Sequence, residues 1–417
     1  MASEPIRIDQ SDHLPRWRRP EAMLLVMSAT VWFGLSLWMV LINNFAVEVV
    51  NFDGSDTGWR ETVREIPGFL AFLVVFVIRW LREQTLAVLS IFVLGAATAV
   101  TSNFPSFWGL LITTYIGSMG FHYFETVNQS LQLQWLSKYE APRKLGWIVA
   151  ASSAGSLIAY SAVLAAREIL DADFDAMFVV GGGVGMLMAA FCWLAYPQFQ
   201  GNTVQRRDMV LKWRYWLYYA LVFMGGARRQ IFIVFAPFMM VEKFGMEVEG
   251  LAAIFLINYA AQMLIAPLIG RMIQRYGERL TLIIEYVGLF GVFSLYVGVY
   301  YFDWEWWVAA VLYIVDHLLF AIAFAQKTYF QKIADPEDQA PTAAVAFTIN
   351  HIAAVFLPAA LGYLWLVSPA SVFSLAVGMS LISLVLATMV PRHPRDGNET
   401  VWARPRPAPT PTTTPAE

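Results

Sequence analysis

The sequence predicts an all-α integral membrane protein with twelve transmembrane helices in two halves of six. Of its 417 residues, 58% are hydrophobic and only 14% are charged, whereas apolar residues make up roughly half of a soluble globular domain. The apolar runs are long enough to cross a bilayer, which takes about 20 helical residues. A short basic segment near the middle of the chain divides these runs into two equal sets.

The expected helices begin and end where apolar runs meet charged residues or proline and glycine. They cover residues 22–48, 59–81, 85–102, 106–134, 146–166, 174–198, 214–241, 249–273, 279–302, 306–330, 342–367 and 371–391. The chain therefore divides into a cytoplasmic N-terminal segment (1–21), an N-terminal six-helix bundle (22–200), a cytoplasmic linker (201–213), a C-terminal six-helix bundle (214–391) and a disordered cytoplasmic tail (392–417).

The positions of Lys and Arg predict that both termini are cytoplasmic, because basic residues favour that side of the membrane. Of the 28 such residues, the segments expected outside hold only Arg60, Arg64, Arg167 and Lys243. We expect a multi-pass protein of the plasma membrane or an inner membrane, surrounded by lipid. The net charge of −3 gives no sign of nucleic-acid binding. No cofactor and no resident metal are expected.

A weak internal repeat relates the two halves. His122 in the fourth helix lies sixteen positions before a loop that begins at Lys138 and reads KYEAP. Asp316 in the tenth helix lies sixteen positions before a loop that begins at Lys332 and reads KIADP. Matched spacing across two halves is typical of transporters built from duplicated units.

The stretch from Gly270 to Arg279, which reads GRMIQRYGER, resembles the short cytoplasmic loop motif of the major facilitator superfamily. In that motif, glycines such as Gly270 and Gly277 permit close helix approach and a tight turn, while basic residues such as Arg275 and Arg279 face the cytoplasm. Gln274 stands where the family usually has an aspartate. The resemblance implies two pseudo-symmetric six-helix bundles around a central cavity lined by the first, fourth, seventh and tenth helices, in a transporter that works as a monomer.

Two adjacent arginines, Arg228 and Arg229, lie near the middle of the seventh helix. A charge at the bilayer centre costs about 2.5–3.5 kcal/mol, so it needs a partner, water or a ligand. Successive helical residues differ by about 100° in direction. We therefore expect one arginine to face the cavity and bind an anionic substrate group, and the other to pair with an acid such as Asp316 or Glu125. Which arginine does which stays open, and a permanent structural ion pair is the alternative.

The fourth helix is the most polar span, and its side chains at helical spacing form one polar stripe. Glu125 and His122 in this stripe, together with Asp316, are candidates for proton coupling. The alternative is that these groups bond the fourth helix to its neighbours. Further candidates for substrate contact, which could equally be satisfied interior groups, are Gln129, His317, Asn350, His351, Asn258 and Gln262.

Two further groups of charges lie near helix ends. Glu285 in the ninth helix is expected close to the cytoplasmic interface, where its side chain could reach Arg275. A charged turn at the outer end of the second helix is expected to form an outside surface or gate network; it consists of Arg60, Glu61, Arg64 and Glu65.

These features favour a secondary active transporter that moves a small polar, anionic solute by alternating access, coupled to protons. No Walker-type phosphate loop is present, and no nucleophile elbow or other catalytic motif predicts an enzyme. A transition-metal transporter is the first alternative, because the membrane helices also hold ligand types suited to such ions, namely His122, His317, His351, Glu125 and Asp316. A non-transporting assembly or sensing protein of the same fold is the second.

Overall fold

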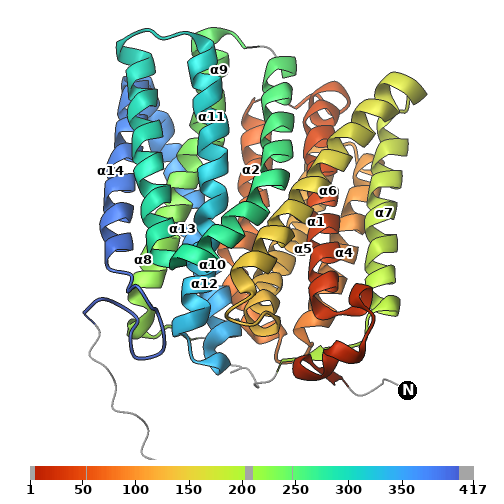
Figure 1. Ribbon diagram of the computed structural model, residues 1–417. Helices are drawn as coiled ribbons and strands as arrows, with labels where there is room; N and C mark the ends of the chain where they lie inside the picture. Colours follow the sequence, from red (N-terminus) through yellow and green to blue (C-terminus); the bar gives the residue numbers. More distant parts are fainter. Residues whose placement is uncertain (1–4, 53, 202–209, 247, 403–417) are drawn as a thin grey trace, which may run out of the picture.

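The computed structural model describes residues 5–52, 54–201, 210–246 and 248–402, which are almost entirely helical (Figure 1). Two short strands, β1 (Ile6–Arg7) and β2 (Phe199–Gln200), pair in parallel and join the N-terminal segment to the chain that follows the sixth span. The N-terminal segment from Pro5 onward lies at one end of the helical bundle (Figure 1), which is called the terminal end below.

The first half contains six membrane spans. The second of them is built from α2 and α3, which a short 3₁₀ turn at Ala71–Leu73 separates. The helices of this half are α1 (Pro20–Glu48), α2 (Gly54–Phe69), α3 (Val74–Val77), α4 (Glu83–Val100), α5 (Phe107–Trp135), α6 (Ala141–Leu170) and α7 (Phe174–Ala195).

The second half repeats this plan, again with interrupted spans. A π-helical turn at Ile231–Phe235 divides the seventh span, and a 3₁₀ turn at Ala321–Ala323 divides the tenth. Its helices are α8 (Trp216–Gln230), α9 (Ala236–Phe244), α10 (Val248–Tyr301), α11 (Trp306–Phe320), α12 (Phe324–Ile333), α13 (Gln339–Val367) and α14 (Pro369–Thr388). Within α10, Gly277 adopts a φ of 82°, a region that favours glycine, and separates the eighth span from the ninth at the expected tight turn.

The described residues confirm the predicted all-α fold with twelve membrane helices. Nine helical segments are long and apolar enough to cross a membrane, and one of them, Ala253–Tyr301, holds two spans on either side of Gly277. The two more polar spans, built on α2 and on α5, bring the number to twelve. The fourth span was expected to be the most polar; α5 is outside the apolar set, but α2 of the second span is more polar still.

The two halves meet along two seams, where α6 packs against α10 and where α13 packs against α2 and α5. Glycines allow close approach at the first seam, because a Cβ at Gly146 would lie only 2.5 Å from the carbonyl oxygen of Ala266. At the terminal end, Gln331 of α12 donates hydrogen bonds to the carbonyl oxygens of Leu133 (2.7 Å) and Leu136 (2.6 Å) at the end of α5. The halves are therefore joined directly at that end.

The chain beyond the twelfth span differs from the expectation of a disordered tail from residue 392. Residues 392–402 pack on the terminal end, where Glu399 pairs with Arg214 and the Tyr329 hydroxyl donates to its carbonyl oxygen. These ion pairs supply the fixed contacts that composition alone does not reveal. Residues 403–417, and the linker residues 202–209, lie outside the described part of the chain.

Candidate functional site

Arg228 is enclosed within the second half. Its side chain is only 2% exposed, and its Nη2 lies 3.1 Å from a carboxylate oxygen of Glu285 in α10. Its Nη1 donates to Ser383 Oγ in α14 at 3.2 Å, and its guanidinium carbon lies 5.0 Å from the centre of the Tyr286 ring. Each of these partners comes from the same half as α8, so Arg228 joins helices within one bundle.

The partner of Glu285 corrects the expectation that this acid reaches the membrane interface or Arg275. Glu285 is fully buried and bonds to Arg228, while Arg275 is exposed and lies over the Tyr276 ring at 5.3 Å. Seven residues of helix, about 10 Å, separate Glu285 from Glu278 at the start of the ninth span. That distance keeps the carboxylate inside the bundle, where it needs a buried partner.

Asp316 of α11 is a second buried acid whose carboxylate is influenced by the charge of Arg228. It is 2% exposed, and Arg228 is the charged group that stabilises its carboxylate. One oxygen of each acid, Glu285 Oε2 and Asp316 Oδ2, has no hydrogen-bond partner among the described residues. A single guanidinium thus faces two buried carboxyl groups.

Arg229 points in a different direction, toward the first half of the protein. Its half-buried side chain is stabilised electrostatically by Glu65 of α2 and Glu125 of α5. Neither acid forms a salt bridge with it in the described part of the chain, and its Nε has no hydrogen-bond partner there. Adjacent residues of α8 therefore face two different environments, as their angular separation requires.

Glu125 has a basic partner that the sequence analysis missed. Lys327 of α12 is the charged group with the largest effect on the Glu125 carboxylate, and Arg229 contributes as well. Lys327 lies within the expected range of the tenth helix, 306–330, but was not among the expected site residues. Its position inside that range, three residues before the expected end, was the available signal.

The charged turn of the second span, expected at an outside surface or in a gate network, is partly enclosed by the protein, since Glu61 is 44% exposed and Glu65 is 20% exposed. Arg60 is only 2% exposed, and Arg64 bonds to Glu61 and to Glu65, each at 2.7 Å. The helix α2 begins at Gly54 rather than at residue 59. Glu65 therefore lies eleven residues, about 16 Å, along the helix from its first residue.

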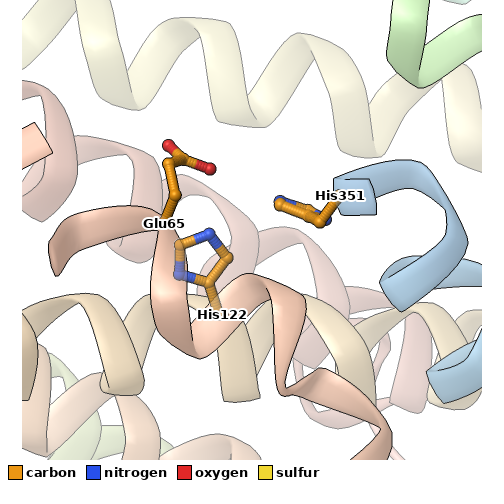
Figure 2. Close-up of side chains that lie close together, drawn as sticks. All are labelled: Glu65, His122 and His351. Carbon is orange, nitrogen blue, oxygen red and sulfur yellow. The ribbon is translucent and has the colours of Figure 1, made fainter. Parts of the chain in front are cut away.

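Two histidines from different halves approach Glu65 (Figure 2). The ring of His122 in α5 lies 5.1 Å from the ring of His351 in α13, at an angle of 81°. Both rings lie over Gly68 of α2, where a Cβ would come within 2.6 Å of His351 and 2.7 Å of His122. One ligand atom from each of Glu65, His122 and His351 lies within 4.8 Å of the others.

The other predicted contacts are dispersed, and most of them join helices. Gln262 accepts a hydrogen bond from Ser153 across the seam between α10 and α6 at 2.6 Å. Asn350 donates to the carbonyl oxygen of Val222 at 3.3 Å. His317 packs against Phe232 and Tyr259, apart from the pair of histidines. Asn258 is buried and Gln129 is half-buried.

The loop motif has a mainly structural setting. A Cβ at Gly270 would overlap the backbone of Pro142 in α6, so this glycine allows the eighth span to approach the fifth. Arg279, at the start of the ninth span, is half-buried. The neighbouring Glu278 is fully buried and pairs with Lys332 at 2.6 Å. The loop therefore contributes to packing and pairing at the terminal end.

Comparison with known families matches nearly the whole chain to one family model. The model of the Major Facilitator Superfamily matches residues 22–358 and residues 218–414. No curated protein matches the sequence.

Solved structures resemble the chain in fold over most of its length. The proton:xylose symporter XylE gives a TM-score of 0.71 at 12% identity, covering 88% of this chain and 94% of that one. The human organic anion transporter MFSD10 gives 0.68 at 14% identity, covering 90% and 100%. A bacterial homologue of the iron transporter ferroportin gives 0.70 at 12% identity, covering 88% and 98%. At these identities the likeness concerns the fold alone.

Proposed function

Since the chain belongs to the major facilitator superfamily, a family of membrane transporters, we propose that it carries a small anionic solute across the membrane by alternating access, coupled to protons. One observation carries this proposal. Arg229 is a cation inside the membrane that faces the opposite half and has no salt bridge in the described part of the chain. Its neighbour Arg228 is already paired within its own half.

Arg229 supplies the binding group for the solute. A guanidinium binds a carboxylate or phosphate through two parallel hydrogen bonds, and such bonds strengthen away from water. Glu65 and Glu125 are the acids whose charges stabilise Arg229, and both belong to the first half. An anion that binds Arg229 would neutralise its charge in place of Glu65 and Glu125. The attraction between Arg229 and these two acids would then weaken. The interaction between the two halves therefore changes when the solute binds, as alternating access requires.

The surroundings of Arg228 supply a place for a proton. Glu285, Asp316 and Arg228 would carry a net charge of −1 if both carboxyl groups were ionised, and all three side chains are buried. Two carboxyl groups that share a buried site favour a state in which one holds a proton. Asp316 remains a coupling candidate on this basis, beside Glu125 with its partner Lys327 and His122 at the interface between the halves.

The orientation and the assembly belong to the same proposal. The excess of Lys and Arg at the terminal end supports a cytoplasmic position for both termini. The solute and protons are the proposed partners, and the working unit is one chain.

A thermal-shift screen of the purified protein tests the proposed solute class, because a ligand that binds the folded state stabilises it. The panel contains carboxylates, phosphates, neutral sugars, amino acids and metal ions. We expect an anion to raise the melting temperature of the wild type and of Arg275→Ala, an exposed matched control, but not of Arg229→Ala. Stabilisation by neutral sugars alone, or by an anion equally in Arg229→Ala, would overturn the assignment.

The anion found in that screen then tests transport itself. Proteoliposomes containing the wild-type protein should show proton flux that depends on the anion, and Arg229→Ala should abolish it. Binding without any solute-dependent movement of protons or solute would instead favour an assembly or sensing protein.

Transition-metal transport is the second candidate function. The approach of His122 and His351 to Glu65 supports it, whereas His317 and Asp316 lie elsewhere. A metal cation as the cargo would meet the positive charges of Arg64 and Arg229 at the same place, which disfavours it. Uptake of a metal ion into proteoliposomes, rather than binding alone, separates this candidate from the first.

A further inference from the structure

We propose that Glu65, His122 and His351 form a binding site for one divalent transition-metal ion, such as Zn²⁺, that ties the two halves of the protein together. The ligands come from three helices, with α2 and α5 in the first half and α13 in the second (Figure 2). This site goes beyond the transport of an anion, because its ion is a stationary ligand rather than the cargo.

The hydrogen bonds of both histidines leave the correct nitrogen free for a metal. Nδ1 of His122 lies 2.9 Å from the carbonyl oxygen of Ser118, and Nδ1 of His351 lies 2.9 Å from that of Phe347. Ser118 Oγ also lies 2.9 Å from His122 Nδ1, but this hydroxyl donates its proton to the carbonyl oxygen of Arg64. A carbonyl oxygen only accepts hydrogen bonds, so both Nδ1 atoms donate and Nε2 presents its lone pair. This backbone bond on the second nitrogen is the usual support of a metal-binding histidine.

The carboxylate of Glu65 is also oriented by a bond to a neighbouring residue. Arg64 bonds to one oxygen of Glu65 at 2.7 Å, which orients the group and leaves its second oxygen for the ion. Two imidazoles and one carboxylate are a ligand set that suits zinc and related ions, and it leaves a fourth position open. Arg64 and Arg229 lower the affinity for a cation, and they favour an anion such as chloride or hydroxide at that position.

Metal binding would draw the two halves closer together. Bonds of about 2.0–2.1 Å in a tetrahedral site place neighbouring ligand atoms roughly 3.3 Å apart. The ligand atoms of the three residues now lie within 4.8 Å of one another. His122 and Glu65 share one half, so His351 is the ligand that has to approach across the seam. The ion would therefore stabilise the arrangement in which α13 lies against α2 and α5.

A titration with Co²⁺ and a competition with Zn²⁺ test the site on purified full-length protein without a histidine tag. We expect one ion per chain, with the visible absorption of four-coordinate Co²⁺ and its loss when Zn²⁺ is added. Loss of a ligand in His122→Ala, His351→Ala or Glu65→Gln should weaken binding by at least about tenfold. His317→Ala, which changes another histidine of the membrane helices, should bind as the wild type does.

A second measurement separates loss of the site from loss of the fold. Zn²⁺ should raise the melting temperature of the wild type and of His317→Ala, but not that of the three ligand variants, provided that these still unfold cooperatively without metal. Gly68→Ala, which keeps every ligand but places a Cβ against both rings, should also weaken binding. Wild-type affinity in both His122→Ala and His351→Ala, or accumulation of radioactive zinc in proteoliposomes, would overturn the proposal.

Discussion

Arg228 and Arg229 are neighbours in sequence but differ in nearly every physical respect. Arg228 is 2% exposed and bonded to Glu285 and Ser383 inside one bundle. Arg229 is half-buried and faces acids of the other bundle without a salt bridge in the described part of the chain. A paired buried charge holds helices together, whereas a charge without a fixed partner remains available to a ligand. A rotation of about 100° around one helix separates a charge paired inside one bundle from a charge that faces the other bundle.

The local backbone reinforces this division. A π-helical turn at Ile231–Phe235 begins directly after Gln230, so α8 and α9 do not form one regular helix. Such turns occur frequently at functional sites. Before the arginines, Gly226 brings α8 against the backbone of Asn350 in α13. The helix is therefore fixed at one point and irregular at the next, with the two arginines between them.

The largest expected effect is on stability, from the loss of one member of the Arg228–Glu285 pair. Arg228→Ala leaves Glu285 and Asp316 without the cation, and removing one partner of a buried pair costs about 3–5 kcal/mol. Thermal unfolding in detergent measures this loss. The double variant Arg228→Met with Glu285→Met should recover most of the stability. A wild-type melting temperature for Arg228→Ala would show that the pair is not structural.

Arg229→Ala should change binding rather than stability. Hydrogen bonds to a charged group contribute about 1.5–3 kcal/mol, which corresponds to a loss in solute affinity of roughly 10–150-fold. Its melting temperature without solute should stay close to that of the wild type, because no salt bridge in the described part of the chain is lost. Calorimetry with the anion from the screen measures the affinity. Stability losses equal to those of Arg228→Ala would remove the distinction between the two arginines.

The two glycines directly before the arginines, Gly225 and Gly226, test how closely α8 packs against its neighbours. A methyl group at Gly226 would overlap the Asn350 carbonyl oxygen, so Gly226→Ala should cost about 1–3 kcal/mol by overpacking. At Gly225 the nearest atom is a side-chain nitrogen of Gln326 at 3.6 Å. Gly225→Ala should therefore be neutral or stabilising by up to about 1 kcal/mol. Equal melting temperatures for both variants would contradict this close approach.

The smallest expected effect concerns an ion pair near water, which serves as a reference for the buried one. Lys212 lies 3.0 Å and Arg214 lies 3.1 Å from the Asp335 carboxylate. Burial works to raise the pKa of Asp335, but the hydrogen bond from Lys212 and the charge of Arg214 outweigh it and hold this pKa below 3.8. Because the side chain is 26% exposed, the stabilisation is at most about 1 kcal/mol.

The lowered pKa of Asp335 makes this stabilisation depend on pH. A lowered pKa in the folded state stabilises the protein above the ordinary value, and the stabilisation is lost as the pH falls through the lowered one. Asp335→Asn should therefore be slightly less stable than the wild type at pH 7. This difference should shrink below about pH 4, as measured by thermal unfolding across the acidic range. A difference that grows on acidification would contradict the pairing.

Sequence patterns predicted the helices well because the bilayer imposes their length and polarity. They also indicated that the two arginines have different roles, since the geometry of a helix requires it. Sequence patterns could not show which arginine has which role, because that depends on which face of α8 meets α10 and α14. Sequence does not show which helices are neighbours, and this also explains the wrong partner for Glu285. Its position in the ninth span was predicted, but the helix that packs against that span was not.

Two differences at the site concern charged residues near the ends of spans. Glu65 was assigned with the charged turn to an outside surface or gate network, on a second helix that was begun at residue 59 rather than at Gly54. Lys327 lies inside the expected tenth helix and is half-buried, and its charge has the largest effect on Glu125, but it was not among the expected site residues. A shift of a few residues changes the depth of a side chain by several ångströms. For a charged group in a membrane, that shift separates water from the protein interior.

The contact of Gln331 with the last turn of α5 has a consequence for how a proton can control the protein. Its two acceptors are main-chain carbonyl oxygens of Leu133 and Leu136, of the kind that a helix leaves unpaired at its C-terminus. These two hydrogen bonds join uncharged groups, so a change of pH or salt concentration does not alter them directly. Substituting the side chain at either leucine also keeps the acceptor. A change of protonation therefore acts on this contact only indirectly, through other groups such as Lys138, whose Nζ donates to the carbonyl oxygen of Lys332 across the same two halves at 3.4 Å.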